Sequence, residues 1–206
     1  MINIGVIGLG LIGGSFALAA KKHFVDAVLF GGDKNTNHIK EAIKKDIIEF
    51  ELKTNDLVKM EVLILAIPVD AASGLVLDIL DKMNDNALLF DVGSTKYSIC
   101  KTVALHPKRN QFLATHPIAG TEFSGPLAAF SDLYVNKTQI LCESEKTRPD
   151  LLGWAIQFFR FMDMNIQEMN PQEHDQHIAY VSHISHISSF MLGKTVMEKE
   201  EDERAI

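Results

Sequence analysis

The sequence lacks a long apolar run, an extended basic cluster and any cysteine pattern, and each absence argues against a class of protein. Without a run of about 18 apolar residues or a basic lead-in after Met1, we expect neither a membrane span nor a signal peptide. A net charge of −7 and a pI near 5.6 provide no positive surface for nucleic acid. Cys100 and Cys142 lie far apart without a CxxC motif, which favours free thiols in a reducing compartment. We therefore expect a cytoplasmic protein.

Short β-branched runs alternate with longer helix-like stretches along most of the chain. This alternation is typical of an α/β fold, in which right-handed crossovers wind helices onto both faces of a mostly parallel sheet. A helix is expected around Asp150 to Met162. The predicted strands are Ile2 to Ile7, Ala27 to Phe30, Val62 to Ala66, Ala87 to Asp91, Phe112 to Thr115, Gln139 to Cys142 and Asn165 to Glu168.

The character of the sequence changes at Asn170. Asn170-Pro171 is a strong N-cap and first-turn pair, and no proline follows it, so one long helix is the simplest interpretation. We expect residues 1–169 to form a nucleotide-binding domain and residues 170–206 to be the first long helix of a helical domain. The chain stops at Ile206 without a C-cap glycine or a partner helix, so we expect that domain to be truncated.

A GxGxxG motif, Gly8 to Gly13, directly follows the first predicted strand and opens a helix near Leu11. Gly8 would permit the tight turn, and Gly13 would allow close packing of helix on strand. Gly10 would let the backbone approach a pyrophosphate, which the amides of the helix start, Leu11 and Ile12 included, would stabilise. In this context the motif predicts a doubly wound Rossmann fold that binds a dinucleotide.

An acidic residue and a proline extend the predicted cofactor site. Asp33 ends the second strand about 20 residues beyond the motif, where a carboxylate can bind the adenosine ribose hydroxyls. Because Asp33 would repel a 2′-phosphate, we expect NAD rather than NADP; the alternative is that Asp33 only caps the next turn or helix. The backbone of Ala66 and Pro68, at the end of another strand, is expected to border the cofactor, although it could equally be a stiffened loop.

His116 and Ser94 follow two further strands and should face the nicotinamide. Oxidation of a carbinol requires a group that takes the hydroxyl proton, and a neutral histidine with a near-neutral pKa is suited to this role. Ser94 could hold His116 in one tautomer or hydrogen-bond on the nicotinamide side. A single histidine after a strand is more often structural than catalytic, so the residues alone leave both readings open.

Four histidines lie on the C-terminal helical stretch: His174, His177, His183 and His186. Spacings of three and four residues can place histidines on one helix face, where they could bind a metal. The second pair, however, lies far around the helix from the first, and no HExxH motif is present. We expect no metal site.

Four segments together resemble the prephenate dehydrogenase family, and they extend over essentially the whole chain. They are GLGLIGGS from Gly8, GSTK from Gly93, HPIAGTEFSG from His116 and HDQHIAYVSHISH from His174. The resemblance implies a Rossmann domain followed by a helical domain that forms a homodimer. It also implies NAD-dependent oxidative decarboxylation of prephenate to 4-hydroxyphenylpyruvate, a step of tyrosine biosynthesis.

The resemblance also implies roles for single residues. His116 corresponds to the catalytic histidine, which binds the ring hydroxyl of the substrate, and Ser94 to the serine that assists it. The positions implied for substrate binding lie at the pocket rim and on the helical segment: Thr121, Glu122, Ser182 and His186. An arogenate or cyclohexadienyl dehydrogenase remains an alternative, as does a non-catalytic NAD-binding module should the chain end at Ile206.

Overall fold

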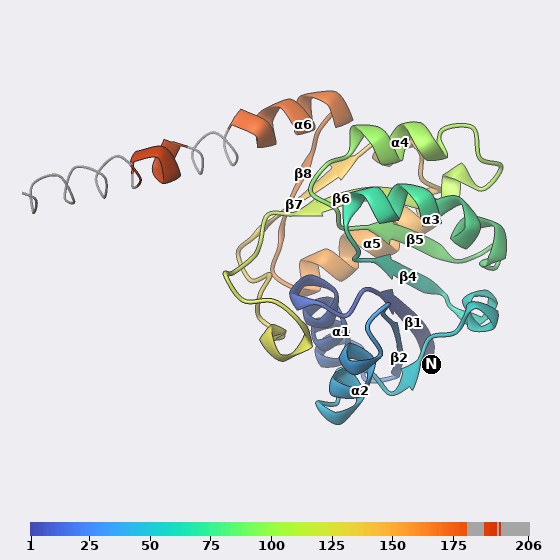
Figure 1. Cartoon of the computed structure of the whole chain (residues 1–206). Coiled ribbons are helices and arrows are strands. Elements are labelled where there is room, and N and C mark those ends of the chain that lie inside the picture. Colours follow the sequence, from blue (N-terminus) through green and yellow to red (C-terminus); the bar gives the residue numbers. More distant parts are fainter. Residues whose placement is uncertain (181–187, 193, 195–206) are drawn as a thin grey trace, which may run out of the picture.

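The computed structural model describes residues 1–180, 188–192 and 194 of the chain. Ser182 and His186, two of the predicted substrate contacts, lie outside the described residues. The described part consists of one sheet covered by helices on both faces (Figure 1). None of the helices described is long and apolar enough to cross a membrane.

The sheet has eight strands in the order β3-β2-β1-β4-β5-β6-β7-β8. Neighbouring strands are parallel except β6 and β7, which are antiparallel. The mostly parallel doubly wound sheet expected from the sequence is thus confirmed. The strands are β1 (Ile2–Ile7), β2 (Ala27–Gly32), β3 (Phe50–Glu51), β4 (Val62–Leu65), β5 (Leu88–Asp91), β6 (Phe112–Pro117), β7 (Thr138–Cys142) and β8 (Asn165–Glu168).

Six α-helices lie within residues 1–180, joined in places by short 3-10 turns. The helices are α1 (Leu11–His23), α2 (Thr36–Lys44), α3 (Val69–Lys82), α4 (Tyr97–Val103), α5 (Pro149–Phe161) and α6 (Pro171–Ile178). The 3-10 turns are η1 (Thr54–Lys59), η2 (Arg109–Gln111), η3 (Pro126–Ala128) and η4 (Ser144–Lys146).

The predicted start of the C-terminal helix is confirmed. The side chain of Asn170 accepts a hydrogen bond from the Gln172 N–H, and Pro171 occupies the first turn, where its missing N–H has no consequence. Residues 188–192 are also helical, while the residues between them and Tyr180 lie outside the description. The single long helix therefore stays a prediction beyond the first turns.

The two faces of the sheet bury separate apolar clusters. One cluster packs beneath α1, α2 and α5, and the other beneath α3 and α4. Phe16 of α1 lies at the centre of the first, with its ring 4.2 Å from that of Tyr134 and close to those of Phe90, Phe158 and Phe159. These contacts fix the angle at which α1 leaves the glycine motif.

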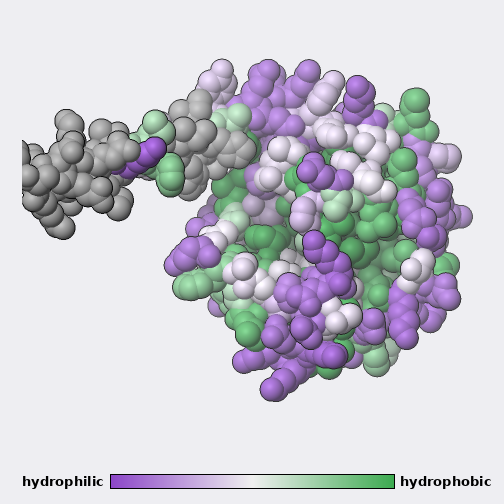
Figure 2. Space-filling model, in the orientation of Figure 1, coloured by the Kyte–Doolittle hydropathy of each residue, from purple (hydrophilic) through white to green (hydrophobic). Residues whose placement is uncertain are grey.

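The order of the strands reverses between β1 and β4, because the chain runs outward through β2 and β3 before it returns to β4. Crossovers in the two directions place helices on opposite faces, which opens a crevice beyond the carboxyl ends of β1 and β4. In the space-filling view a band of hydrophobic surface crosses the middle of the face shown, between hydrophilic side chains (Figure 2).

Replacement of Phe16 by alanine is expected to lower the free energy of unfolding by about 3–5 kcal/mol, because the cavity left among four aromatic rings cannot collapse fully. Leu105→Ala serves as the control, since Leu105 is 97% exposed and its truncation should change stability by less than about 0.5 kcal/mol. Urea unfolding of the two variants measures both values. Equal losses would contradict this assignment of the core.

Candidate functional site

A cavity of about 740 Å³ occupies the crevice at the reversal of strand order. Its walls come from the carboxyl ends of β1, β2 and β4, from η1, from His38 of α2 and from one side of α3 between Asp70 and Ile79. Five of the residues predicted to bind a cofactor line it: Gly8, Gly10, Asp33, Ala66 and Pro68. Leu11, Ile12 and Gly13 form the first turn of α1 behind the glycine loop.

The three glycines of the motif serve different needs. Gly8 has a φ of +98°, and a Cβ there would lie 2.2 Å from the carbonyl oxygen of Ala66. A Cβ on Gly13 would lie 1.9 Å from the carbonyl oxygen of Gly8, so both positions require glycine for the fold itself. Gly10 has a negative φ, and a Cβ there would meet nothing within 4 Å. Its lack of a side chain instead leaves space at the N-terminus of α1, where helix amides favour an anion.

Asp33 makes hydrogen bonds at the mouth of this cavity. Its carboxylate accepts from the Leu9 N–H at 2.8 Å and from the Asn35 N–H at 2.8 Å, while His38 Nδ1 lies 3.3 Å away. Burial acts to raise the pKa of Asp33, but these hydrogen bonds outweigh it and hold the pKa below its ordinary value. Asp33 therefore is negatively charged at neutral pH. Asn35, rather than Asp33, caps α2.

A buried ion pair joins the ends of β5 and β6. Lys96 Nζ contacts the carboxylate of Asp91 and donates to the Thr115 carbonyl oxygen at 2.7 Å, and both charged side chains are almost fully buried. The Asp91 carboxylate also accepts from the Gly93 N–H at 3.0 Å. Burial raises the pKa of Asp91, while Lys96 and the backbone donors oppose this shift. These contacts fix the loop that leads from β5 into α4.

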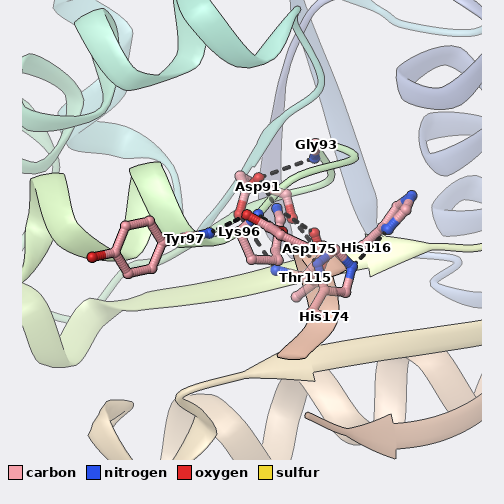
Figure 3. Close-up of polar contacts among 8 residues, drawn as sticks. All are labelled: Asp91, Gly93, Lys96, Tyr97, Thr115, His116, His174 and Asp175. Carbon is pink, nitrogen blue, oxygen red and sulfur yellow. Dashed lines mark hydrogen bonds and ion pairs between the residues drawn. The ribbon is translucent and has the colours of Figure 1, made fainter. Parts of the chain in front are cut away.

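His116, at the carboxyl end of β6, is held by a residue of α6. His116 Nδ1 lies 2.9 Å from His174 Nε2, and His174 Nδ1 lies 2.7 Å from Asp175 Oδ1 (Figure 3). Asp175 in turn accepts the backbone N–H groups of Lys96 and Tyr97 at 2.7 and 2.9 Å. A continuous chain of contacts thus connects the start of α4, α6 and the imidazole of His116.

The surroundings keep both histidines of this chain uncharged. Burial lowers the pKa of His116 to about 3, and the nearby His174 and Lys96 add to this effect, while Asp175 opposes it. Burial also lowers the pKa of His174, although Asp175 opposes the shift. At neutral pH His116 is therefore a neutral imidazole, which has a lone pair able to accept a proton. Its pKa lies below the near-neutral value expected from the sequence, because the side chain is largely buried beside His174 and Lys96.

The remaining predicted site residues lie in loops at the same edge of the sheet. Ser94 is exposed in the loop between β5 and α4, and Thr121 and Glu122 are exposed in the loop after β6. Within the described residues no hydrogen bond joins Ser94 to His116, so the contact expected of Ser94 is made by His174. The other alternative for Ser94, a contact on the nicotinamide side, stays a prediction.

The sequence pointed to neither His174 nor Asp175 as partners of His116. Both residues lie in the HDQH segment, whose histidine spacing raised the alternative of a metal site that was then rejected on the sequence alone. Searched over the residues that the structure describes, no group of three metal-binding side chains is found. The signal that could have found the pair is an Asp directly after a His, early in a helix that follows the last strand of the sheet.

Two family descriptions match the chain, one for each part. Residues 16–167 match the family "Prephenate dehydrogenase, nucleotide-binding domain", and residues 170–206 match "Prephenate dehydrogenase, dimerization domain". The first match extends over well more than half of the chain.

Individual proteins with similar sequences are also described as dehydrogenases. A prephenate dehydrogenase of Bacillus subtilis (strain 168) is 32% identical over 177 residues, which cover 84% of this chain and 48% of that protein. A cyclohexadienyl dehydrogenase of Zymomonas mobilis is 27% identical over 181 residues, 84% of this chain and 60% of the relative. The chain thus spans about half of the first relative and three fifths of the second.

A solved structure superposes closely on this one. It is the prephenate dehydrogenase of A. aeolicus in complex with hydroxyphenyl propionate and NAD+, with a TM-score of 0.84 and 26% identity. The match covers 96% of this chain and 70% of that one.

The two histidines should make stability depend on pH. Since their pKa values lie below the ordinary 6.5, the unfolded chain binds more protons than the folded chain below that pH. We expect the free energy of unfolding to fall as the pH drops from about 6.5 toward 3, and part of this loss to vanish in His116→Gln. Urea unfolding between about pH 7.5 and 5, above the range where most carboxylates titrate, measures the slope. His177→Gln, at an exposed position, is the control; equal slopes in all three proteins would refute the assignment.

Proposed function

Because the chain belongs to the prephenate dehydrogenase family, we propose that it catalyses the NAD-dependent oxidative decarboxylation of prephenate to 4-hydroxyphenylpyruvate. One observation carries this proposal beyond family membership. A neutral histidine, His116, lies at the carboxyl end of β6, on the edge of the sheet where the glycine loop opens into the cavity. Three strand spacings separate β1 from β6, about 14 Å, so a ligand as extended as a dinucleotide is needed to connect the two.

The residues of the cavity suit NAD. The space above Gly10 would take the pyrophosphate at the start of α1, and the backbone of Ala66 and Pro68 would border the cofactor. The carboxylate of Asp33 would accept hydrogen bonds from the ribose hydroxyls and repel a 2′-phosphate, which favours NAD over NADP. When bound, NAD supplies the acceptor for the hydride of the ring carbinol.

His116 would accept the proton of the ring hydroxyl as the hydride leaves. Loss of the hydride makes the ring electron-poor, and carbon dioxide then leaves readily as the ring becomes aromatic. The protein is therefore asked mainly to orient the substrate and to take this proton, a general-base role. We propose that Ser94 assists on the nicotinamide side and that Thr121 and Glu122 form the rim of the substrate pocket. Ser182 and His186 stay proposals drawn from the family resemblance.

The C-terminal segment would form the dimer interface. We propose a domain boundary between residues 169 and 170, which the end of β8 at Glu168 and the N-cap at Asn170 support. The match of residues 170–206 to a dimerization domain favours a homodimer. Large apolar side chains are exposed there, including Tyr180 at 70%, Phe190 at 74% and Leu192 at 67%, and a second copy could bury them.

The two thiols support a reducing compartment. Cys100 and Cys142 are buried and form no disulfide. Burial raises the pKa of each thiol to about 12, so both stay protonated and weakly reactive at neutral pH. We propose that the protein works in the cytoplasm.

A broader specificity is the second candidate, because the Zymomonas mobilis relative is described as a cyclohexadienyl dehydrogenase. Arogenate differs from prephenate only in its side chain, which carries an amino group in place of the keto group. Initial rates of NADH formation with prephenate and with arogenate distinguish the candidates. A rate with arogenate at or above that with prephenate would replace the narrower assignment.

The role of Gly10 predicts that its replacement by alanine weakens NAD binding but hardly changes the stability of the fold. Gly10→Ala should change the free energy of unfolding by less than about 1 kcal/mol, since nothing lies within 4 Å of the added carbon. The dissociation constant for NAD, measured by calorimetry, should rise at least about tenfold, because that carbon enters the pyrophosphate space. The matched variant Gly13→Ala should instead lose stability through its clash with Gly8. Unchanged NAD affinity in Gly10→Ala would contradict a dinucleotide site.

The role of His116 predicts a loss of turnover without a loss of NAD binding. His116→Asn removes the proton acceptor and should reduce the rate of NADH formation with prephenate by about 10²–10⁴-fold. The NAD dissociation constant should change by less than about twofold, because His116 does not line the cofactor cavity. A variant that turned over at the wild-type rate would remove His116 from the mechanism. A chain that binds NAD but never forms NADH would either be a binding module or need a completed helical domain for turnover.

A further inference from the structure

The contacts of His116 join it to a pair of residues that the proposed reaction does not use directly. His174 is fully buried, and its ring stands at 75° to that of His116, edge to face, with the two centroids 5.1 Å apart. His116 comes from β6 and His174 from α6, and the two side chains point toward one another (Figure 3). Such a geometry holds one nitrogen of each ring in a defined hydrogen bond.

The direction of these hydrogen bonds follows from counting protons. Asp175 accepts backbone N–H groups on both oxygens, and a carboxylate is an acceptor only, so the proton between Asp175 and His174 lies on His174 Nδ1. Because His174 is neutral, its Nε2 has a lone pair and no hydrogen. His116 Nδ1 must therefore carry a hydrogen and donate it to His174 Nε2.

The consequence for His116 lies at its other nitrogen. A neutral imidazole has one N–H, so a hydrogen on Nδ1 leaves Nε2 with the lone pair. Within the described residues Nε2 has no hydrogen-bond partner, and the side chain is partly exposed at the edge of the sheet. This nitrogen is thus the one available to take a proton from a ligand.

We propose that His174 and Asp175 are positioning residues that hold His116 in the tautomer with a free Nε2. The proposal rests on the proposed function, because the tautomer matters to catalysis only if His116 is the base. Without the acceptor on His174, the tautomer with a hydrogen on Nε2 becomes available, and that tautomer cannot accept a proton there. Asp175 acts one step further out and fixes the tautomer of His174.

The first test reads the tautomer directly and does not depend on turnover. Long-range proton–nitrogen NMR correlations of the chain near pH 7.5 distinguish the protonated from the unprotonated nitrogen of each imidazole. Signals are assigned by their loss in His116→Gln and His174→Gln. We expect a hydrogen on Nδ1 in both rings of the wild-type protein. A hydrogen on Nε2 of His116 would overturn the proposal whatever the activity of the chain.

Two substitutions at His174 separate the acceptor from the bulk of the ring. The amide oxygen of His174→Gln can accept from His116 Nδ1 and should keep its tautomer. His174→Leu offers no acceptor and should shift His116 partly or fully to the tautomer with a hydrogen on Nε2. His177→Leu, on the exposed side of α6, is the matched control and should leave the signals of His116 unchanged. An unchanged tautomer in His174→Leu would refute the role of His174.

Kinetics then connect the tautomer to the reaction. For His174→Leu we expect kcat to fall about 10–100-fold with little change in KM, and for His174→Gln a smaller loss, since outer hydrogen-bond partners typically have effects of this size. Equal losses in both variants would indicate that the ring only fills space. If the wild-type chain shows the expected tautomer but never forms NADH, the proposed function fails while the positioning of His116 stands.

Discussion

The buried ion pair between Lys96 and Asp91 fixes the geometry on which the site depends. Its ammonium group bridges the carboxylate at the end of β5 and a carbonyl oxygen of β6, so the two strand ends are held in one arrangement. The backbone N–H of the same lysine binds Asp175 of α6. Removal of either charge would leave the other buried without a partner, which commonly costs about 3–5 kcal/mol. Lys96 is therefore the point where the sheet, α4 and α6 meet.

Much of the fold could be predicted from the sequence, because parallel strands that are buried on both faces have short continuous apolar sequences between helix-like stretches. All seven predicted strands are present. The strand β3 was missed because it consists of two exposed residues, Phe50 and Glu51, and has no apolar pattern. The antiparallel pairing of β6 and β7 could not be predicted either, since a run of apolar residues does not indicate the direction of its strand relative to the neighbouring strand.

The candidate site also has one part that could be predicted from the sequence and one part that could not. The glycine motif and Asp33 could be predicted because their spacing is set within one β-α-β unit, and the structure places them around one cavity. The contact between His116 and His174 spans 58 residues and exists only because α6 docks against α4. Nothing local to either histidine encodes that docking. This is why the sequence suggested Ser94, the nearer candidate, as the residue that orients the imidazole.

The hydrogen bonds of Asp175 also bear on how such proteins can be recombined. His116 lies in the part of the chain that matches the nucleotide-binding domain, while His174 and Asp175, to which it is connected, lie in the part that matches the dimerization domain. A chimera of two relatives joined just after β8 would keep the dinucleotide cavity intact. The contact made by His116 would then depend on the helix that the second parent supplies in place of α6. A junction placed after α6 instead takes His116, His174 and Asp175 from the same parent and keeps their contacts together.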